Sequence, residues 1–184
     1  MYNDVFVQRP RYELDVKRFY LDEYQPYWRR GEKNPNFTKS SFSSKILDLK
    51  EKKYSAINYF YKEVNQIIWK NYPIVTVPSS DPQNINTGIN QVALLLAKQG
   101  SINAISCLRR HTAVQKKTNG GNRDIYVDLR SIEVNNQYLI KGRIVLLLDD
   151  ITTTGNSFRA CEKLLVDAGA SKVVKLALGK TVRY

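Results

Sequence analysis

The pattern of apolar and polar positions in the first half of the chain predicts a helix, a strand and a second helix. Apolar side chains recur at helical spacing between residues 43 and 70, with Ser43 or Ser44 as the N-cap. The β-branched run at residues 73–77 predicts a short strand. Residues 87–91 then begin a second helix whose apolar positions share one face.

The second half of the chain continues this alternation. Residues 101–108 and 125–134 are typical of further strands, the latter at a sheet edge, and residues 172–178 of a last buried strand. Four consecutive apolar residues at 145–148 predict a strand buried on both faces, and the helix after it ends at Gly169. Alternating strands and helices predict an α/β fold with a doubly wound, mostly parallel sheet and a ligand at the carboxyl ends of its strands.

An aromatic-rich N-terminal extension, residues 1–42, precedes the α/β core of residues 43–184. Its many aromatic side chains are not typical of a disordered tail. We expect it to pack over the main sheet as a cover or hood for the site, although aromatic rings interleaved with arginines can also stack on nucleic-acid bases. At 184 residues the chain is expected to form a single domain.

Composition narrows the choice of partners and compartment. The net charge of +12 predicts attraction to polyanions or phosphorylated ligands, and general solubility is the alternative explanation of the same charge. Cys107 and Cys161 lie in apolar surroundings without metal-site spacing, which favours a reducing cytosol. The first residues do not resemble a signal peptide and no apolar run could span a bilayer, so we expect a cytoplasmic protein without a membrane partner. The sequence leaves open a homodimer and a basic surface for nucleic acid.

The most informative stretch is residues 145–157, where two carboxylates follow the apolar strand. Asp149 and Asp150 are suited to accept hydrogen bonds from sugar hydroxyls or to hold a hydrated metal ion. The next residues combine hydroxyls, a glycine that allows close backbone approach and the N-terminus of a helix, which attracts phosphate. They are Thr152, Thr153, Thr154, Gly155, Asn156 and Ser157. Phosphate donors beside sugar acceptors predict a sugar-phosphate site.

A purely structural interpretation fits each of these residues taken alone, because acids can end a strand and a hydroxyl can cap a helix. Capping needs one hydroxyl, however, and gives no reason for paired acids. Two other phosphate motifs are absent from the sequence: the Gly-Lys-Ser/Thr end of a Walker loop and any G-x-G-x-x-G at a helix start.

At every position this string resembles the phosphoribosyl pyrophosphate (PRPP) signature of type I phosphoribosyltransferases: four apolar residues, two acids, an apolar residue, any residue, two hydroxyls, glycine, any residue and a hydroxyl. Three further segments are similar to the ComF-like branch of that family. They are Val77-Pro78-Ser79-Ser80 after a strand, the helix start Gly88-Ile89-Asn90-Gln91, and Arg110 followed by Thr112 and Gln115. The aromatic segment at residues 1–42 stands where that branch often carries a zinc ribbon.

The resemblance implies ribose hydroxyls at Asp149 and Asp150, the 5′-phosphate at residues 152–157, and the pyrophosphate at Ser79 and Ser80. Mg²⁺ would arrive on the pyrophosphate, near the two acids, without a metal site formed by the protein alone. Residues 109–124 are a basic, glycine-containing stretch that we expect to be a mobile loop or hairpin, and the resemblance implies that the loop at residues 109–117 would close over the pyrophosphate. Its candidate cations are Arg109, Arg110, Lys116 and Lys117, and the first three are expected to be catalytic together with Asp149 and Asp150.

The implied activity is transfer of the phosphoribosyl group from PRPP to an unidentified base or other acceptor, with release of pyrophosphate. Residues 1–42 are expected to supply any base-binding hood. The alternative is a non-catalytic ComF-like protein that senses PRPP or is associated with DNA uptake or nucleic acid, a function that a net charge of +12 would suit.

Overall fold

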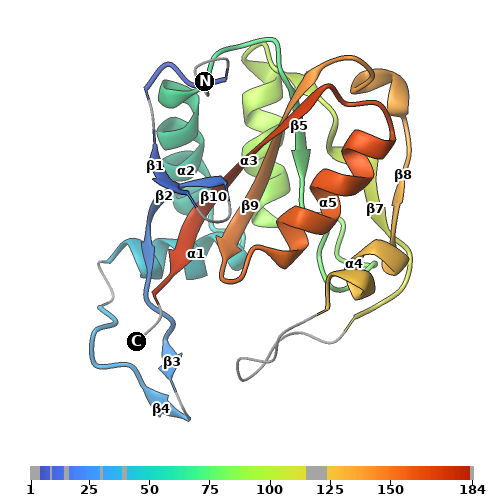
Figure 1. Cartoon of the computed structure of the whole chain (residues 1–184). Helices are drawn as coiled ribbons and strands as arrows, with labels where there is room; N and C mark the ends of the chain where they lie inside the picture. The colour runs from blue at the N-terminus through green and yellow to red at the C-terminus, as the bar shows by residue number, and fades with distance from the viewer. Residues whose placement is uncertain are drawn as a thin grey trace.

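A six-stranded, mostly parallel β-sheet forms the centre of the molecule within the described residues (Figure 1). The computed structural model describes residues 5–8, 10–14, 17–29, 31–38, 41–114 and 124–182. The strand order is β1-β2-β10-β9-β5-β6, and the β1–β2 pair alone is antiparallel in this sheet. Its strands are β1 (Arg11–Glu13), β2 (Arg18–Tyr24), β5 (Pro73–Thr76), β6 (Ile102–Asn103), β9 (Ile144–Thr152) and β10 (Lys172–Thr181). The predicted α/β class with a mostly parallel sheet is confirmed.

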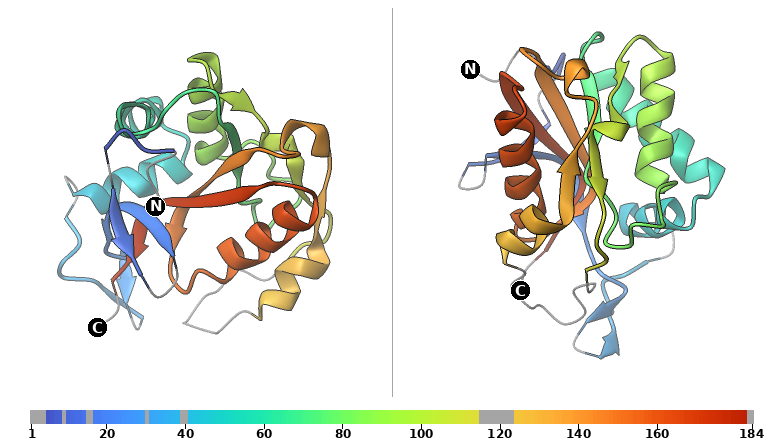
Figure 2. Two further views of the ribbon diagram at one scale, coloured as in Figure 1. Left: turned by 45° about the horizontal axis from the view of Figure 1, so that its top comes forward. Right: turned by 90° about the vertical axis from the view of Figure 1, so that its right-hand side faces the viewer.

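Helices cover both faces of this sheet (Figure 2). One face carries α1 (Phe42–Lys50), α2 (Tyr54–Ile67) and α3 (Gly88–Lys98), and the other carries α4 (Ile125–Ser131) and α5 (Asn156–Asp167). Two small antiparallel pairs complete the described chain: β3 (Trp28–Arg29) with β4 (Glu32–Lys33), and β7 (Leu108–Arg110) with β8 (Ile132–Val134). Short 3₁₀ turns lie at Ile105–Cys107 and Gln137–Leu139.

Strand β9 is buried on both faces, as its run of apolar residues predicts. Leu146 and Leu148 point into the core beneath α1, α2 and α3, whereas Val145 and Leu147 point into the core beneath α5. All four side chains are inaccessible to solvent. Successive side chains of a strand face opposite sides, so a strand between two helical layers must be apolar at every position.

The connections of the sheet diverge between β5 and β9. From β5 the chain crosses one face through α3 and returns at β6, while from β9 it crosses the other face through α5 and returns at β10. Because β5 and β9 are parallel neighbours whose connections leave in opposite directions, a crevice opens between their carboxyl ends. In open α/β sheets this is where ligands bind.

The segment at residues 43–70 forms two helices instead of one. Helix α1 begins after Ser41, whose side chain accepts a hydrogen bond from the Ser44 amide, and the chain turns at Lys52 with φ +60° before α2. Both helices bury their apolar faces in the same core, and for that reason the helical spacing continues across the break. The N-cap is therefore Ser41 and not Ser43 or Ser44.

Two strand predictions are wrong over most of their length. Residues 101–108 form only the short β6 before a 3₁₀ turn, where the Asn103 side chain accepts a hydrogen bond from the Ile105 amide. Residues 125–134 form α4 and then β8. Helix α4 buries polar side chains and exposes Tyr126 and Val127, so its apolar positions do not mark its inner face.

The N-terminal extension joins the sheet at its edge. Strand β2 pairs in parallel with β10, and β1 pairs with β2. Phe19 and Tyr12 pack their rings together against the α1–α2–α3 core. Strands β1 and β2 thus extend the sheet at its edge instead of lying across it, while β3 and β4 form a separate pair.

The cysteines and the lengths of the helices bear on two further predictions. Cys107 and Cys161 are free and buried. No described helix combines the length and the apolar character that crossing a membrane requires.

Candidate functional site

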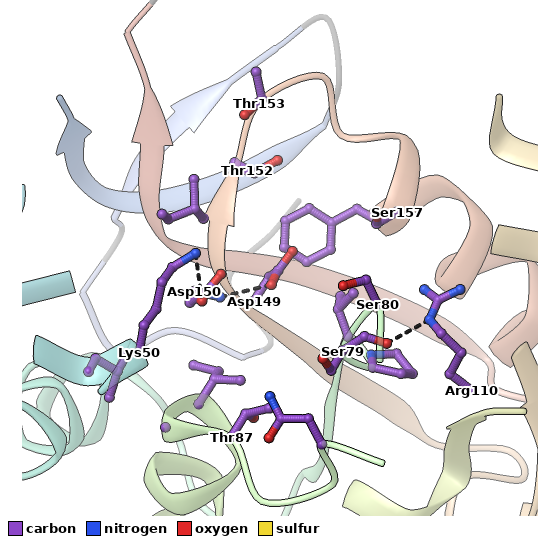
Figure 3. Close-up of a pocket in the computed structure, with 18 of the residues that line it drawn as sticks. Lys50, Ser79, Ser80, Thr87, Arg110, Asp149, Asp150, Thr152, Thr153 and Ser157 are labelled. Carbon is purple, nitrogen blue, oxygen red and sulfur yellow. Dashed lines mark hydrogen bonds and ion pairs between the residues drawn. The ribbon is translucent and has the colours of Figure 1, made fainter. Parts of the chain in front are cut away.

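A cavity of about 540 Å³ lies at the carboxyl ends of β5 and β9 (Figure 3). Its walls bring together nearly all the residues that the sequence singles out: Ser79, Ser80, Arg110, Asp149, Asp150, Thr152, Thr153, Thr154, Gly155, Asn156 and Ser157. Arg109 instead lines a neighbouring cavity on the other side of the β5–α3 loop. Lys116 and Lys117, with the rest of the predicted basic loop at 115–123, lie outside the described residues.

The β9–α5 loop wraps around the start of α5 as a phosphate-binding loop would. Gly155 is the N-cap of the helix and adopts φ +78°, a left-handed conformation that favours glycine. The first amides of a helix lack partners within it and sit at the positive end of its dipole. Asn156, Ser157 and Phe158, the first three residues of α5, line the cavity.

The hydroxyl side chains of this loop have different partners. Thr152 is buried and accepts a hydrogen bond of 2.6 Å from Arg18, and Thr153 is 2.9 Å from the Thr181 hydroxyl on β10. Ser157 donates a 3.0 Å hydrogen bond to Asp128. Among the described residues, Thr154 makes only a long contact of 3.5 Å, in which its hydroxyl accepts from the Asn156 amide. A phosphate in the cavity would therefore meet the backbone amides and Thr154 more readily than the other hydroxyls.

Arg18 holds this loop from behind and was not identified in the sequence. It comes from β2, is 2% exposed, and also donates to the Thr153 carbonyl at 3.1 Å. Glu13 balances its charge with an ion pair of 2.6 Å. A Cβ atom on Gly155 would stand 2.7 Å from the Arg18 guanidinium, so any larger residue here would have to displace Arg18 as well as adopt a positive φ. An arginine within an aromatic-rich strand gives no sequence signal of this role.

Asp149 and Asp150 are the last acids of β9 and form part of the cavity lining. The strand continues through them to Thr152, further than the apolar run indicates. Asp149 accepts a 2.9 Å hydrogen bond from the Asp150 amide. Burial, and then the neighbouring charge of Asp150, raise the pKa of the Asp149 carboxyl well above its usual value.

Lys50, at the end of α1, is a second residue that the sequence did not reveal. Its Nζ lies 3.4 Å from Asp150 Oδ2. Burial alone would lower the pKa of Lys50, but the charges of Asp150, Tyr24 and Asp149 and the hydrogen bond to Asp150 together hold it above its usual value. The start of α3 contacts the end of α1 at Gly88. Only a residue without a side chain fits there, because a Cβ atom on Gly88 would stand 2.0 Å from the Leu49 carbonyl oxygen.

No protein-family model, curated protein or solved structure matches the chain.

Arg110 is not a mobile loop cation. It ends β7, is 3% exposed, and donates a 2.6 Å hydrogen bond from Nε to the Ser79 carbonyl in the β5–α3 loop. It also forms an ion pair of 2.8 Å with the fully buried Asp128 of α4. No sequence pattern marks Asp128 as part of the site, because the residues around it predict a strand.

No group of three or more metal-binding side chains occurs among the described residues. The two carboxylates at the end of β9 are nevertheless the hard oxygen donors that Mg²⁺ prefers. They are consecutive residues that both line the cavity, and the negative charge of Asp150 opposes ionisation of Asp149. This donor set fits a hydrated cation that a bound ligand also coordinates.

Proposed function

We propose that the chain is a phosphoribosyltransferase of the type I class, which binds PRPP with Mg²⁺ between β5 and β9. The observation that carries this proposal is the single cavity into which the β9–α5 loop, the two acids and the Ser79–Ser80 loop all converge. PRPP consists of a 5′-phosphate, a ribose and a pyrophosphate. The β9–α5 loop suits the 5′-phosphate, the two acids suit the ribose hydroxyls, and the Ser79–Ser80 loop suits the pyrophosphate.

Each part of the ligand has a defined place in this proposal. The 5′-phosphate binds the amides at the start of α5 and the Thr154 hydroxyl. The ribose hydroxyls donate to Asp149 and Asp150. The pyrophosphate lies along Ser79 and Ser80, and Mg²⁺ bound there would coordinate its oxygens with Asp149 or Asp150 nearby and would neutralise charge on the leaving group.

The reaction breaks the bond between C1 of the ribose and the pyrophosphate oxygen, which leaves with the electron pair. The acceptor's nucleophilic atom forms a new bond to C1 and loses a proton. The ribose ring carries positive charge in the transition state, and the carboxylates of Asp149 and Asp150 stabilise it there. Paired acids are also costly in a site that only binds an anion, because two carboxylates repel it. This argument favours a transferase over a PRPP sensor.

A screen for pyrophosphate release tests the activity. PRPP and Mg²⁺ are offered with bases, nucleotides and other nucleophiles in turn. Asp149→Asn should reduce turnover with the productive acceptor by roughly tenfold or more while PRPP affinity changes little, because the loss falls on the transition state. Asp167→Asn, an exposed acid on α5 paired with Lys163, is the matched control. If no acceptor yields pyrophosphate and Asp149→Asn still binds PRPP normally, the protein is a sensor.

A further inference from the structure

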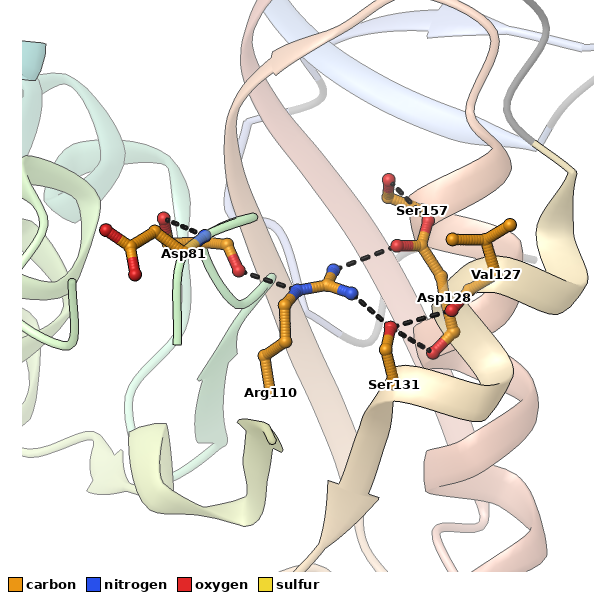
Figure 4. A network of polar contacts seen from close by, with 7 residues as sticks. Asp81, Arg110, Val127, Asp128, Ser131 and Ser157 are labelled. Atoms are coloured by element: carbon orange, nitrogen blue, oxygen red, sulfur yellow. Dashed lines mark hydrogen bonds and ion pairs between the residues drawn. The ribbon is translucent and has the colours of Figure 1, made fainter. Parts of the chain in front are cut away.

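A buried polar network joins the two sides of the cavity (Figure 4). The guanidinium of Arg110 uses its three nitrogens for three partners: the Ser79 carbonyl, the Ser131 hydroxyl and the Asp128 carboxylate. The other Asp128 oxygen accepts the hydroxyl of Ser157 at 3.0 Å. A continuous path therefore runs from the β5–α3 loop, through β7 and α4, to the first turn of α5.

The ends of this path are the two places that the proposed ligand must bridge. Ser79 belongs to the wall assigned to pyrophosphate, and Ser157 to the wall assigned to the 5′-phosphate. The Ser79 side chain also accepts a 3.2 Å hydrogen bond from the Asp81 amide, so the Arg110 contact acts on a loop that is already ordered by a turn. Fixing the Ser79 carbonyl fixes the direction of that turn.

Stability alone is a weak reason for such a network. Burying an ion pair costs solvation that its attraction barely repays, and well-packed apolar residues often stabilise a fold equally well. Arg110 and Asp128 are 3% and 0% exposed, so this cost applies in full. What an apolar pair cannot supply is direction: a planar guanidinium sets three partners at fixed angles.

We propose that Arg110 and Asp128 are positioning residues that hold the pyrophosphate-side loop and the first turn of α5 at the spacing that one bridging ligand requires. The proposal rests on the proposed function, because it assumes that PRPP spans both walls. Neither side chain needs to touch the ligand. Arg110 acts through the Ser79 carbonyl, and Asp128 acts through Ser157.

The consequence is a selective loss of affinity for the ligand that spans both walls. In Arg110→Lys the charge remains, but an ammonium cannot reproduce the three directed hydrogen bonds. We expect PRPP–Mg²⁺ affinity to fall by about tenfold or more, since small misplacements of a site carry costs of this order. In the proposed function ribose 5-phosphate contacts the start of α5 and the two acids of β9 but not the Ser79–Ser80 loop, so it should bind within about twofold of the wild type.

Calorimetry with PRPP, ribose 5-phosphate and inorganic pyrophosphate, each with Mg²⁺, measures this selectivity. The control is Lys175→Met, which breaks a partly buried ion pair, Lys175 with Glu162 at 2.5 Å, away from the cavity lining. It should leave all three affinities unchanged. If Arg110→Lys does not fold, the double variant Arg110→Met/Asp128→Leu removes both buried charges together and should show the same selective loss.

Three results would overturn the proposal. Wild-type PRPP affinity in folded Arg110→Lys means that the network does not set the spacing. An equal loss for all three ligands, matched by Lys175→Met, means that it only supports the fold. A wild-type protein that binds none of the three ligands overturns the proposed function as well, whereas the first two results leave that function standing.

Discussion

At the scale of single residues, the hydroxyl side chains after β9 perform different tasks although they look alike in the sequence. Thr152 accepts from Arg18, Thr153 pairs with Thr181, and Ser157 donates to Asp128. Thr154 has the weakest protein contact and lines the cavity. We therefore expect a bound phosphate to accept a hydrogen bond from the Thr154 hydroxyl and not from the Thr153 hydroxyl.

Replacing Thr154 with valine tests this distinction. Losing a hydrogen bond to a charged group costs about 1.5–3 kcal/mol, so ribose 5-phosphate should bind roughly tenfold to a hundredfold more weakly to Thr154→Val. Thr153→Val removes an exposed hydroxyl that is engaged by Thr181, and should change the affinity by less than about threefold, the size expected of an exposed substitution that removes no ligand contact. Calorimetry on both variants decides the matter, and equal losses would contradict the assignment.

The acid pair should make the folded protein sensitive to pH. The raised pKa of Asp149 means that the folded state holds a proton more strongly than the unfolded chain does. The free energy of unfolding therefore falls as pH rises from the ordinary aspartate pKa, about 3.9, through the raised folded value. Asp149→Asn removes this loss and can still accept the hydrogen bond from the Asp150 amide.

We accordingly expect Asp149→Asn to be more stable than the wild type at pH 7, with an advantage that disappears below about pH 4. Urea unfolding at a series of pH values measures it, without ligand or Mg²⁺. Asp167→Asn, whose carboxyl is 58% exposed, should give no such advantage. If the wild type is at least as stable as Asp149→Asn at pH 7, the ionised Asp149 carboxylate beside Asp150 does not lower the free energy of unfolding.

At the scale of elements, the β9–α5 loop depends on a strand more than a hundred residues earlier in the chain. Arg18 on β2 approaches Gly155 so closely that a Cβ atom would stand 2.7 Å from its guanidinium. Strand β2 reaches this place because it pairs with β10 along Leu176 to Thr181. The N-terminal extension is thereby part of the site's support.

Gly155→Ala should measure this support. A non-glycine residue in the left-handed region costs about 1–2 kcal/mol, and displacement of Arg18 adds to it. Gly142→Ala is the matched control, because Gly142 has φ +70° but no atom within 4 Å of its Cβ position. Urea unfolding should show a larger loss of stability for Gly155→Ala than for Gly142→Ala. Equal losses would mean that Arg18 moves aside without cost.

The elements that the sequence predicts correctly are those whose apolar faces meet the two cores. The apolar run of β9 and the amphipathic α5 are of this kind, because burial alone determines their pattern. The prediction for α4 is wrong because the inner face of this helix carries Asp128 and Ser131, which are paired with Arg110, and not apolar side chains. The roles of Arg18 and Lys50 could not be predicted for a related reason. Their partners, the β9–α5 loop and Asp150, lie far away in the sequence, so the local pattern of residues does not reveal these contacts.

At the scale of the whole molecule, the site lies where the connections of the sheet diverge, with positive charge around the acid pair. Lys50, Lys52 and Arg110 line the cavity with Asp149 and Asp150, and Arg18 lies directly behind its loop. This arrangement, together with a net charge of +12, suits an anionic ligand that carries its own cation. The same net charge would suit nucleic acid, which a steep salt dependence of binding would reveal.

Titration of PRPP with Mg²⁺ into the wild-type protein, followed by competition, tests the central claim most directly. The account predicts one PRPP per chain, displaced both by ribose 5-phosphate and by pyrophosphate, because each occupies one wall of the same cavity. Thr154→Glu, which places a negative charge against the phosphate, should abolish binding in a folded protein. Absence of binding in the wild type, or unchanged binding in folded Thr154→Glu, would contradict the account.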